Sequence, residues 1–223
     1  MFRKNVLTIL VLLGMMAVII PAAQGSIVFT LNESGCCGSG PFGTVTLDQT
    51  TANLVTVTET LNPGVNWAGT GAGEALEFNI LNDPAINFAI ASTNNNQTNF
   101  SAGVGTAQAS PYGTFDYFIH CITCQGGTGP TGTLTFTVAL AVAGPLDIAS
   151  FEVKSGAPPN GATPSYVASD ICLQSLQPGA CTGNAGASDF QIKNNPPVPE
   201  PVTSGLVGTG LVSLFFLRRR VRG

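Results

Sequence analysis

An alternation of apolar and polar residues with a period of two constrains the fold of this chain most. In the clearest run, residues 133–142, Leu, Phe and Val alternate with Thr and Ala. Successive side chains of a strand point to opposite faces, so this run predicts a strand with one buried face. Similar runs occur at 75–80, 86–90 and 115–121, and weaker ones at 27–31, 44–48, 54–61 and 148–154.

Turn-forming residues separate these runs, and no stretch of the body has the 3.6-residue apolar period of an amphipathic helix. Examples are Asn-Pro-Gly at 62–64, Asn-Asp-Pro at 82–84 and Pro-Pro-Asn-Gly at 158–161. Eight or so short strands joined by such turns predict an all-β fold, a single antiparallel β-sandwich or jelly-roll domain. The segment 157–195 has a poorer pattern and is expected to be mainly loop.

The first 25 residues have the three parts of a secretory signal peptide. Arg3 and Lys4 form a basic start, residues 6–20 are an apolar run, and small residues follow. Ala23-Gln24-Gly25 fits the small-x-small cleavage pattern, so cleavage is expected before Ser26. The alternative is an uncleaved membrane anchor. The pattern predicts Sec-type export through the inner membrane, with signal peptidase as a partner where cleavage occurs.

Charge in the expected mature body is strongly one-sided. Between Ser26 and Pro197, only Lys154 and Lys193 are basic, against eleven acidic residues, which gives a net charge of −9. Nucleic acid is an unfavourable partner because phosphate binding needs Lys and Arg. An anionic membrane surface is disfavoured for the same reason. A neutral glycan, a divalent cation or a basic partner remains compatible with this charge.

Six cysteines in an exported chain predict disulfides and no bound metal, although a zinc site at the Cys-x-x-Cys of 121–124 is an alternative. Neighbouring cysteines rarely bridge each other for geometric reasons. We therefore expect Cys172 to pair with Cys181, and the first two cysteines to pair with the next two. The six residues are Cys36, Cys37, Cys121, Cys124, Cys172 and Cys181.

The C-terminal stretch has a proline-rich motif, an apolar run and a basic end. The apolar run 202–217 has 16 residues. As a helix it would cover roughly 24 Å, slightly less than a hydrocarbon core of about 30 Å, and arginine stems can cover part of the deficit. Arginines directly after the run favour a cytoplasmic C-terminus. The basic residues are Arg218, Arg219, Arg220 and Arg222.

This tail resembles the PEP-CTERM signal of Gram-negative bacteria. The resemblance covers residues 196–223 and rests on the motif, the span and the arginine cluster in that order and spacing. It implies that an exosortase sorts the chain and removes the tail, and that the protein reaches the cell surface or an exopolysaccharide matrix of a biofilm. An ordinary membrane anchor is the alternative. The motif residues are Val198, Pro199, Glu200 and Pro201.

Candidate chemistry in the body is sparse, and neither a catalytic residue nor a cofactor is expected. His120 is the only histidine, and no Gly-x-Ser-x-Gly nucleophile elbow is present. Trp67, the only tryptophan, lies in a loop-like context, where it either contacts a glycan or covers the edge of the core. A calcium site built from distant loops and a glycosidase carboxylate pair remain alternatives, because the residues of either site can lie far apart in the sequence.

The sequence thus predicts a signal peptide at 1–25, an ectodomain at 26–195 and a sorting tail at 196–223. Within the tail, the motif is 198–201, the transmembrane span 202–217 and the basic stop 218–223. The expected function is that of a non-enzymatic, exported surface or matrix protein. A carbohydrate-binding module and a secreted hydrolase are the alternatives.

Overall fold

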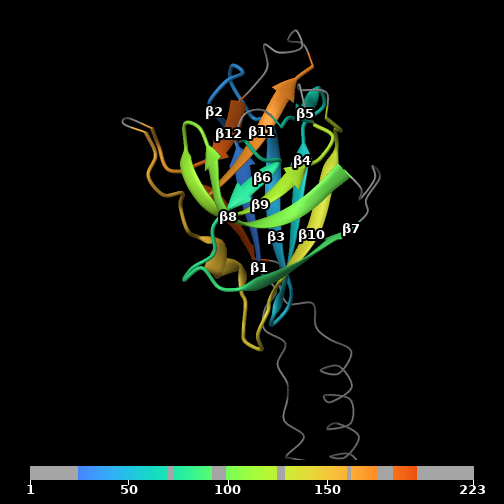
Figure 1. Cartoon of the computed structure of the whole chain (residues 1–223), viewed down its shortest axis with the longest axis vertical. Helices are drawn as coiled ribbons and strands as arrows, with labels where there is room; N and C mark the ends of the chain where they lie inside the picture. The colour runs from blue at the N-terminus through green and yellow to red at the C-terminus, as the bar shows by residue number, and fades with distance from the viewer. Residues whose placement is uncertain are drawn as a thin grey trace, which may run out of the picture.

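The fold of the chain is all-β, as the alternation predicts, with two antiparallel sheets packed over one core (Figure 1). It was obtained as a computed structural model, which describes residues 25–69, 73–91, 99–124, 129–159, 162–174 and 183–194. The expected signal peptide and sorting tail lie almost entirely outside these ranges.

The first sheet has six strands among the described residues, in the order β13-β1-β3-β4-β10-β7. Its central hairpin, β3 and β4, continues on either side into β1 and β10, and every pairing is antiparallel. The strands are β1 (Gly25–Leu31), β3 (Gly43–Thr51), β4 (Leu54–Leu61), β7 (Ile86–Ala91), β10 (Thr133–Leu140) and β13 (Phe190–Asn194).

The second sheet has seven strands among the described residues. Six follow the order β2-β12-β11-β6-β9-β8, and β5 pairs with β11 beside this path. Figure 1 shows this sheet in front of the first, with β2, β12 and β5 towards the upper end. The strands are β2 (Glu33–Ser34), β5 (Val65–Trp67), β6 (Leu76–Phe78), β8 (Phe100–Ala109), β9 (Gly113–Cys121), β11 (Val167–Leu173) and β12 (Gly183–Ala187).

The core lies between the two sheets and consists of the inward residues of the alternating runs. Phe78 of β6 stacks on Tyr117 of β9 at 5.8 Å and on Phe136 of β10 at 6.0 Å, so its ring joins the two sheets. Such aromatic pairs stabilise beyond the area they bury. Fully buried residues of this core include Phe29, Leu31, Leu47, Leu76, Ile119, Phe136 and Ile171.

One weak strand prediction is wrong. Residues Ile148–Phe151, expected to begin a strand at 148–154, form the short 3-10 helix η2. The carboxylate of Asp147 accepts a hydrogen bond from the backbone N–H of Ser150 at 2.9 Å and so caps the first turn. Phe151 is buried in the core, so the apolar residues of this run anchor a short helical turn and do not form a strand.

The prediction of loop for most of 157–195 is also wrong, because this segment contains β11, β12 and β13. Nearly every residue of β11 is buried, since the strand lies inside the second sheet and is covered on both faces. Such a strand shows no alternation. In β12 the buried residues are small, Ala185 and Ala187, and carry little hydropathic signal.

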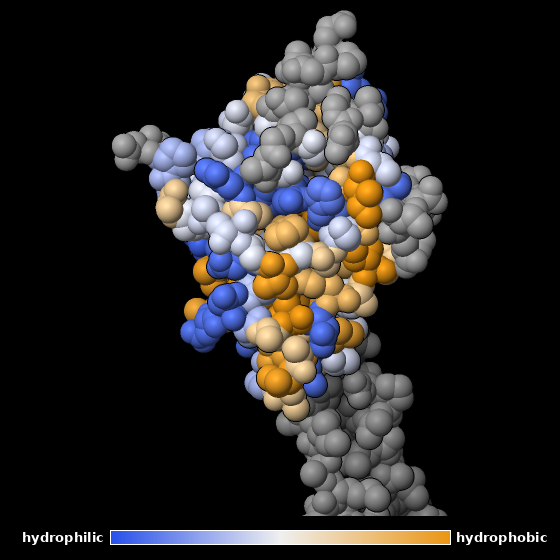
Figure 2. Space-filling model, in the orientation of Figure 1, coloured by the Kyte–Doolittle hydropathy of each residue, from blue (hydrophilic) through white to orange (hydrophobic). Residues whose placement is uncertain are grey.

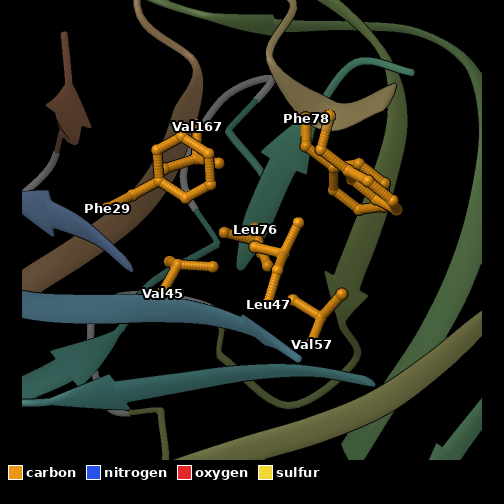
Figure 3. A pocket seen from close by; sticks show the side chains of 8 residues that line it. Phe29, Val45, Leu47, Val57, Leu76, Phe78 and Val167 are labelled. Atoms are coloured by element: carbon orange, nitrogen blue, oxygen red, sulfur yellow. The ribbon is translucent and has the colours of Figure 1, made fainter. Parts of the chain in front are cut away.

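A small void remains between the sheets (Figure 3). Its volume is about 10 Å³, and all of its lining side chains are apolar. A void of that size is at the lower limit for a single water molecule, and its lining offers none of the polar partners that would hold one, so it is a packing defect and not a ligand site. The lining residues are Phe29, Val45, Leu47, Val57, Leu76, Phe78, Phe151 and Val167.

Apolar side chains that reach the surface come from separate elements. In Figure 2, apolar residues gather over the middle and lower part of the face that carries β8 and β9, and polar residues lie mainly above and to the left of them. Single exposed apolar residues are normal in soluble domains and by themselves mark no docking site. The large exposed ones among the described residues are Leu81, Val104, Ile122, Val142 and Ile192.

Candidate functional site

The two ends of the described chain lie side by side. Gly25, the first residue of β1, pairs with Asn194, the last residue of β13, in an antiparallel register. The expected signal peptide and sorting tail therefore join the domain at neighbouring positions on one edge of the first sheet. The motif at 198–201, the span at 202–217 and the stop at 218–223 lie outside the described residues, within which no helix is long and apolar enough to cross a membrane.

The disulfides differ from the expected pairing. Cys36 bonds to its neighbour Cys37, and Cys121 bonds to Cys124, so the predicted bridges between these two pairs are wrong. Cys172 is also disulfide-bonded. Its predicted partner, Cys181, lies outside the described residues. Each described cysteine is thus oxidised, as expected for an exported chain.

The sheet order explains why the two pairs do not bridge each other. β2 pairs with β12 and carries Cys36 and Cys37 to one edge of the second sheet, where Cys36 faces Gly183. Cys121 ends β9, which lies beyond β12, β11 and β6. Four strand spacings amount to roughly 19 Å, whereas bridged cysteines need Cα atoms within about 7 Å.

Trp67 is a core residue, so the prediction of a glycan contact at this position is wrong. Its exposed fraction is 1%, and its ring packs edge-on against Phe100 at 5.3 Å. The indole Nε1–H donates a hydrogen bond to Oε2 of Glu59 at 2.9 Å. The residue therefore binds one oxygen of a buried carboxyl group, whose other oxygen, Oε1, has no hydrogen-bond partner among the described residues, and it cannot reach a ligand on the surface.

Glu59 lies inside the sandwich, on the inward face of β4. It is fully buried and lies between Val57 and Leu61 in the alternation. Burial raises the pKa of its carboxyl group from the usual 4.5 to about 8, although the nearby hydroxyl of Ser169 and the hydrogen bond from Trp67 act in the opposite direction. Because Trp67 belongs to β5 of the second sheet, its hydrogen bond to this carboxyl group links the two sheets, and at neutral pH the group is mostly protonated.

A second buried carboxyl group, that of Glu77, lies on the opposite side of the second sheet from the core. Leu76 and Phe78 on either side of it belong to the core, so Glu77 points outward. It is nevertheless fully buried, and burial raises its pKa to about 8. The backbone N–H of Glu74, which donates to Oε1 at 3.0 Å, lowers that pKa, whereas the carboxylates of Glu74 and Asp170 raise it.

His120 lies at the rim of this acidic cluster. Its Nδ1 is 2.6 Å from Oε2 of Glu74, and its side chain is 49% exposed. An exposed pair of this kind orients both side chains but contributes little to stability. Ser101 of β8 is the cross-strand partner of His120, but within the described ranges no hydrogen bond joins the two side chains, and no group of three His, Cys, Asp or Glu residues there has a geometry that could hold a metal ion.

Sequence reasoning missed the buried carboxyl groups, although one of them had a readable signal. In Leu54–Leu61 the inward positions carry Val, Val, Glu and Leu, so the alternation itself places Glu59 in the core. Asp170 gave no signal, because β11 is buried on both faces. Glu77 and Asp170 are both fully buried, whereas a glycosidase pair has to face the substrate.

The chain matches no family model, and no curated protein or solved structure shows significant similarity to it. Its function is therefore inferred from its own residues and their geometry. Three features are available for that inference: the paired ends of the domain, the oxidised cysteines, and the polar side chains of the two sheets.

Proposed function

We propose that this chain is an exported, non-enzymatic surface or matrix protein that an exosortase sorts through its C-terminal tail. The observation that carries the proposal is the tail itself: the Val-Pro-Glu-Pro motif, the apolar run and the arginine cluster in the order of a PEP-CTERM signal. In this proposal, residues 1–25 are a signal peptide, and residues 202–217 form a transmembrane helix until the tail is removed.

The geometry of the domain supports this arrangement. Because Gly25 and Asn194 are paired neighbours, both membrane-directed segments leave from the same end of the sandwich. That end faces the membrane during sorting. The loops with Cys36–Cys37 and Cys121–Cys124 lie away from it, next to the ends of β2 and β9. Oxidised cysteines also support an exported location.

The motif offers a recognisable peptide beside a membrane stop. Pro199 and Pro201 restrict the backbone on both sides of Glu200, which favours an extended conformation. A cationic pocket of the sorting enzyme can bind the Glu200 carboxylate. In the proposal, the apolar run holds this motif at the outer surface of the inner membrane, and the four arginines fix its depth.

Sorting is tested by replacing Pro199, Glu200 and Pro201 with alanine. Export should remain intact, while the tail stays uncleaved and the protein stays in the inner membrane. The measurement is cell fractionation with mass determination of the C-terminus, in a host with an exosortase and in one without. A matched control replaces Pro196 and Pro197, which lie just before the motif. Identical full-length protein in the inner membrane of both hosts would show an ordinary anchor instead.

A further inference from the structure

The outer face of the six-stranded sheet carries a regular array of threonines. Three neighbouring strands, β3, β4 and β10, each present three outward residues, and the antiparallel register aligns them in three rows. We name these nine residues the threonine array. Its rows are Thr44, Thr60 and Thr133; Thr46, Thr58 and Thr135; and Asp48, Thr56 and Thr137.

The array is open to a partner on the outside of the sheet. Thr60 is exposed and the other eight positions are half-buried, since neighbouring side chains pack against one another. Within the described part of the chain, the hydroxyls of Thr44, Thr46 and Thr137 make no side-chain hydrogen bond. The contact between the Thr58 and Thr135 hydroxyls is long, 3.4 Å. Several donors and acceptors on this face are therefore available to a ligand.

The spacing of the array is set by the sheet. Neighbouring strands lie about 4.8 Å apart, and alternate residues of a strand lie about 6.8 Å apart. The three rows and three strands therefore span roughly 10 Å by 14 Å, with a methyl and a hydroxyl group at nearly every point. Such a surface offers hydrogen bonds and apolar contacts together, repeated at intervals comparable to the size of a sugar ring.

Charge indicates which partners this face fits. Asp48 is the one ionisable residue of the array, and its carboxylate accepts a hydrogen bond from the Ser26 hydroxyl at 2.6 Å. Lys193 lies two strands away, on the edge strand β13. The body carries a net charge of −9, so an anionic partner is repelled. A cationic partner meets a single carboxylate on this face. A neutral, hydroxyl-rich partner fits best.

The twist of the sheet indicates whether that partner is rigid. Adjacent strands rotate by about 20–25° relative to each other, so the three strands of the array do not form a flat plane. A rigid crystalline surface such as ice touches only part of a twisted array. A single polysaccharide chain rotates about its glycosidic bonds and follows the twist.

We propose that the threonine array binds an extended chain of a neutral polysaccharide. The threonine hydroxyls exchange hydrogen bonds with sugar hydroxyls, and the methyl groups pack against the C–H faces of the rings. This inference deepens the proposed matrix role and rests on it for its biological setting. It differs from a surface tryptophan site, because it uses no aromatic side chain and lies on the sheet.

The test compares the full-length chain, purified in neutral detergent, with the triple variant Thr46→Val, Thr58→Val and Thr135→Val. Valine keeps the size and the strand preference of threonine and removes the hydroxyl. The control triple variant replaces Thr51, Thr114 and Thr163, which lie outside the array, by valine. Affinity electrophoresis in gels containing hydroxyethylcellulose measures binding to a neutral glucan, and gels containing alginate measure binding to an anionic one.

We expect hydroxyethylcellulose to retard the wild type and the control variant, and the array variant to bind at least about tenfold more weakly, as the loss of three hydrogen-bonding groups implies. Alginate should retard none of them. Equal retardation of the array and control variants overturns the proposal, as does retardation by alginate alone. A change in oligomeric state with unchanged glucan binding also overturns it, because the array would then contact a second copy.

Failure of this proposal is distinguishable from failure of the sorting proposal. The array variant keeps the intact tail, so its fractionation in a host with an exosortase should match that of the wild type. Normal sorting without glucan binding would overturn the array proposal alone. Glucan binding by a chain whose tail is never processed would overturn the sorting proposal alone.

Discussion

The two sheets of this domain hold their polar side chains in opposite ways. The six-stranded sheet turns threonine hydroxyls outward and places one carboxyl group, that of Glu59, in the core. The seven-stranded sheet turns Glu77 and Asp170 away from the core, yet buries both completely. The threonine hydroxyls stay half exposed, so their positions cost little desolvation free energy. Buried carboxyl groups are expensive to ionise, so the response of the domain to pH depends on Glu59 and Glu77, whose pKa values burial raises.

The largest expected effect comes from removing the partner of Glu59. Trp67→Ala leaves a large cavity beside the buried carboxyl group and should lower the free energy of unfolding by about 3–5 kcal/mol. Trp67→Phe keeps most of the ring but removes the N–H, so it should cost about 1–3 kcal/mol. Urea denaturation at pH 5 measures both. A loss below about 1 kcal/mol for Trp67→Ala would indicate that Trp67 lies on the surface in solution, where it could contact a glycan.

The next largest effect is the change of the free energy of unfolding with pH. Burial raises the pKa of Glu59 and of Glu77 to about 8 in the folded state, against a usual 4.5. The unfolded chain therefore releases these protons first as pH rises. The stability that these two groups contribute is complete below about pH 4.5 and is lost progressively up to about pH 8, by up to about 5 kcal/mol for each group.

Glu59→Gln and Glu77→Gln should each flatten this decline when stability is measured across that pH range. Exposed Glu152 is the matched control, and its replacement by Gln should leave the profile unchanged. Stability that rises between pH 5 and pH 8 in the wild type would contradict the burial of both carboxyl groups in solution.

A smaller effect separates the two buried acids. The carboxylate of Asp170 helps to raise the pKa of Glu77, but it is not among the groups that shift Glu59. Asp170→Asn should therefore lower the pKa of Glu77 and leave that of Glu59 unchanged. Carbon-13 NMR titration of the glutamate carboxyl groups measures both. Equal displacement of the two pKa values would mean that the two sheets do not hold their acids independently.

The smallest effect on the free energy of unfolding is expected for His120, at the rim of the acidic cluster of Glu74, Glu77 and Asp170. His120→Gln breaks the exposed contact with Glu74 and should change the free energy of unfolding by less than about 1 kcal/mol. Thermal denaturation at pH 6 and at pH 8 measures it, with exposed Lys193→Gln as a control. A larger loss would show that the Glu74–His120 pair holds the acidic cluster in place.

Most of the strands that the sequence predicted have one buried face, although β6 was predicted correctly and is buried on both. Leu54–Leu61 and Thr133–Leu140 alternate clearly and are found where expected. β8 was missed because Phe100–Ala109 consists largely of Gly and Ala. Gly103 lies so close to the ring of Phe118 that a Cβ atom would clash with it. A glycine kept for close packing reads as a turn in the sequence, although it belongs to a strand.

The site was less predictable than the fold. Alternation places Glu59 inside, but the effect on its pKa depends on Trp67 and Ser169, which come from other strands. The disulfides depend on sheet order, which no local pattern contains: only the pairing of β2 with β12 separates Cys36 and Cys37 from Cys121. The threonine rows depend on register, and the sequence shows only that Thr recurs at every second position.

The pairing of β1 with β13 also has a consequence for the order in which the domain can fold. β1 is the first strand of the described chain to be synthesised and β13 the last, and the two form one edge of the sheet together. The outer edge of β1 therefore stays unpaired until the chain has been made as far as Asn194. If the chain is exported as proposed above, the sheet is completed only when the whole body has crossed the membrane, just before the motif at 198–201 follows.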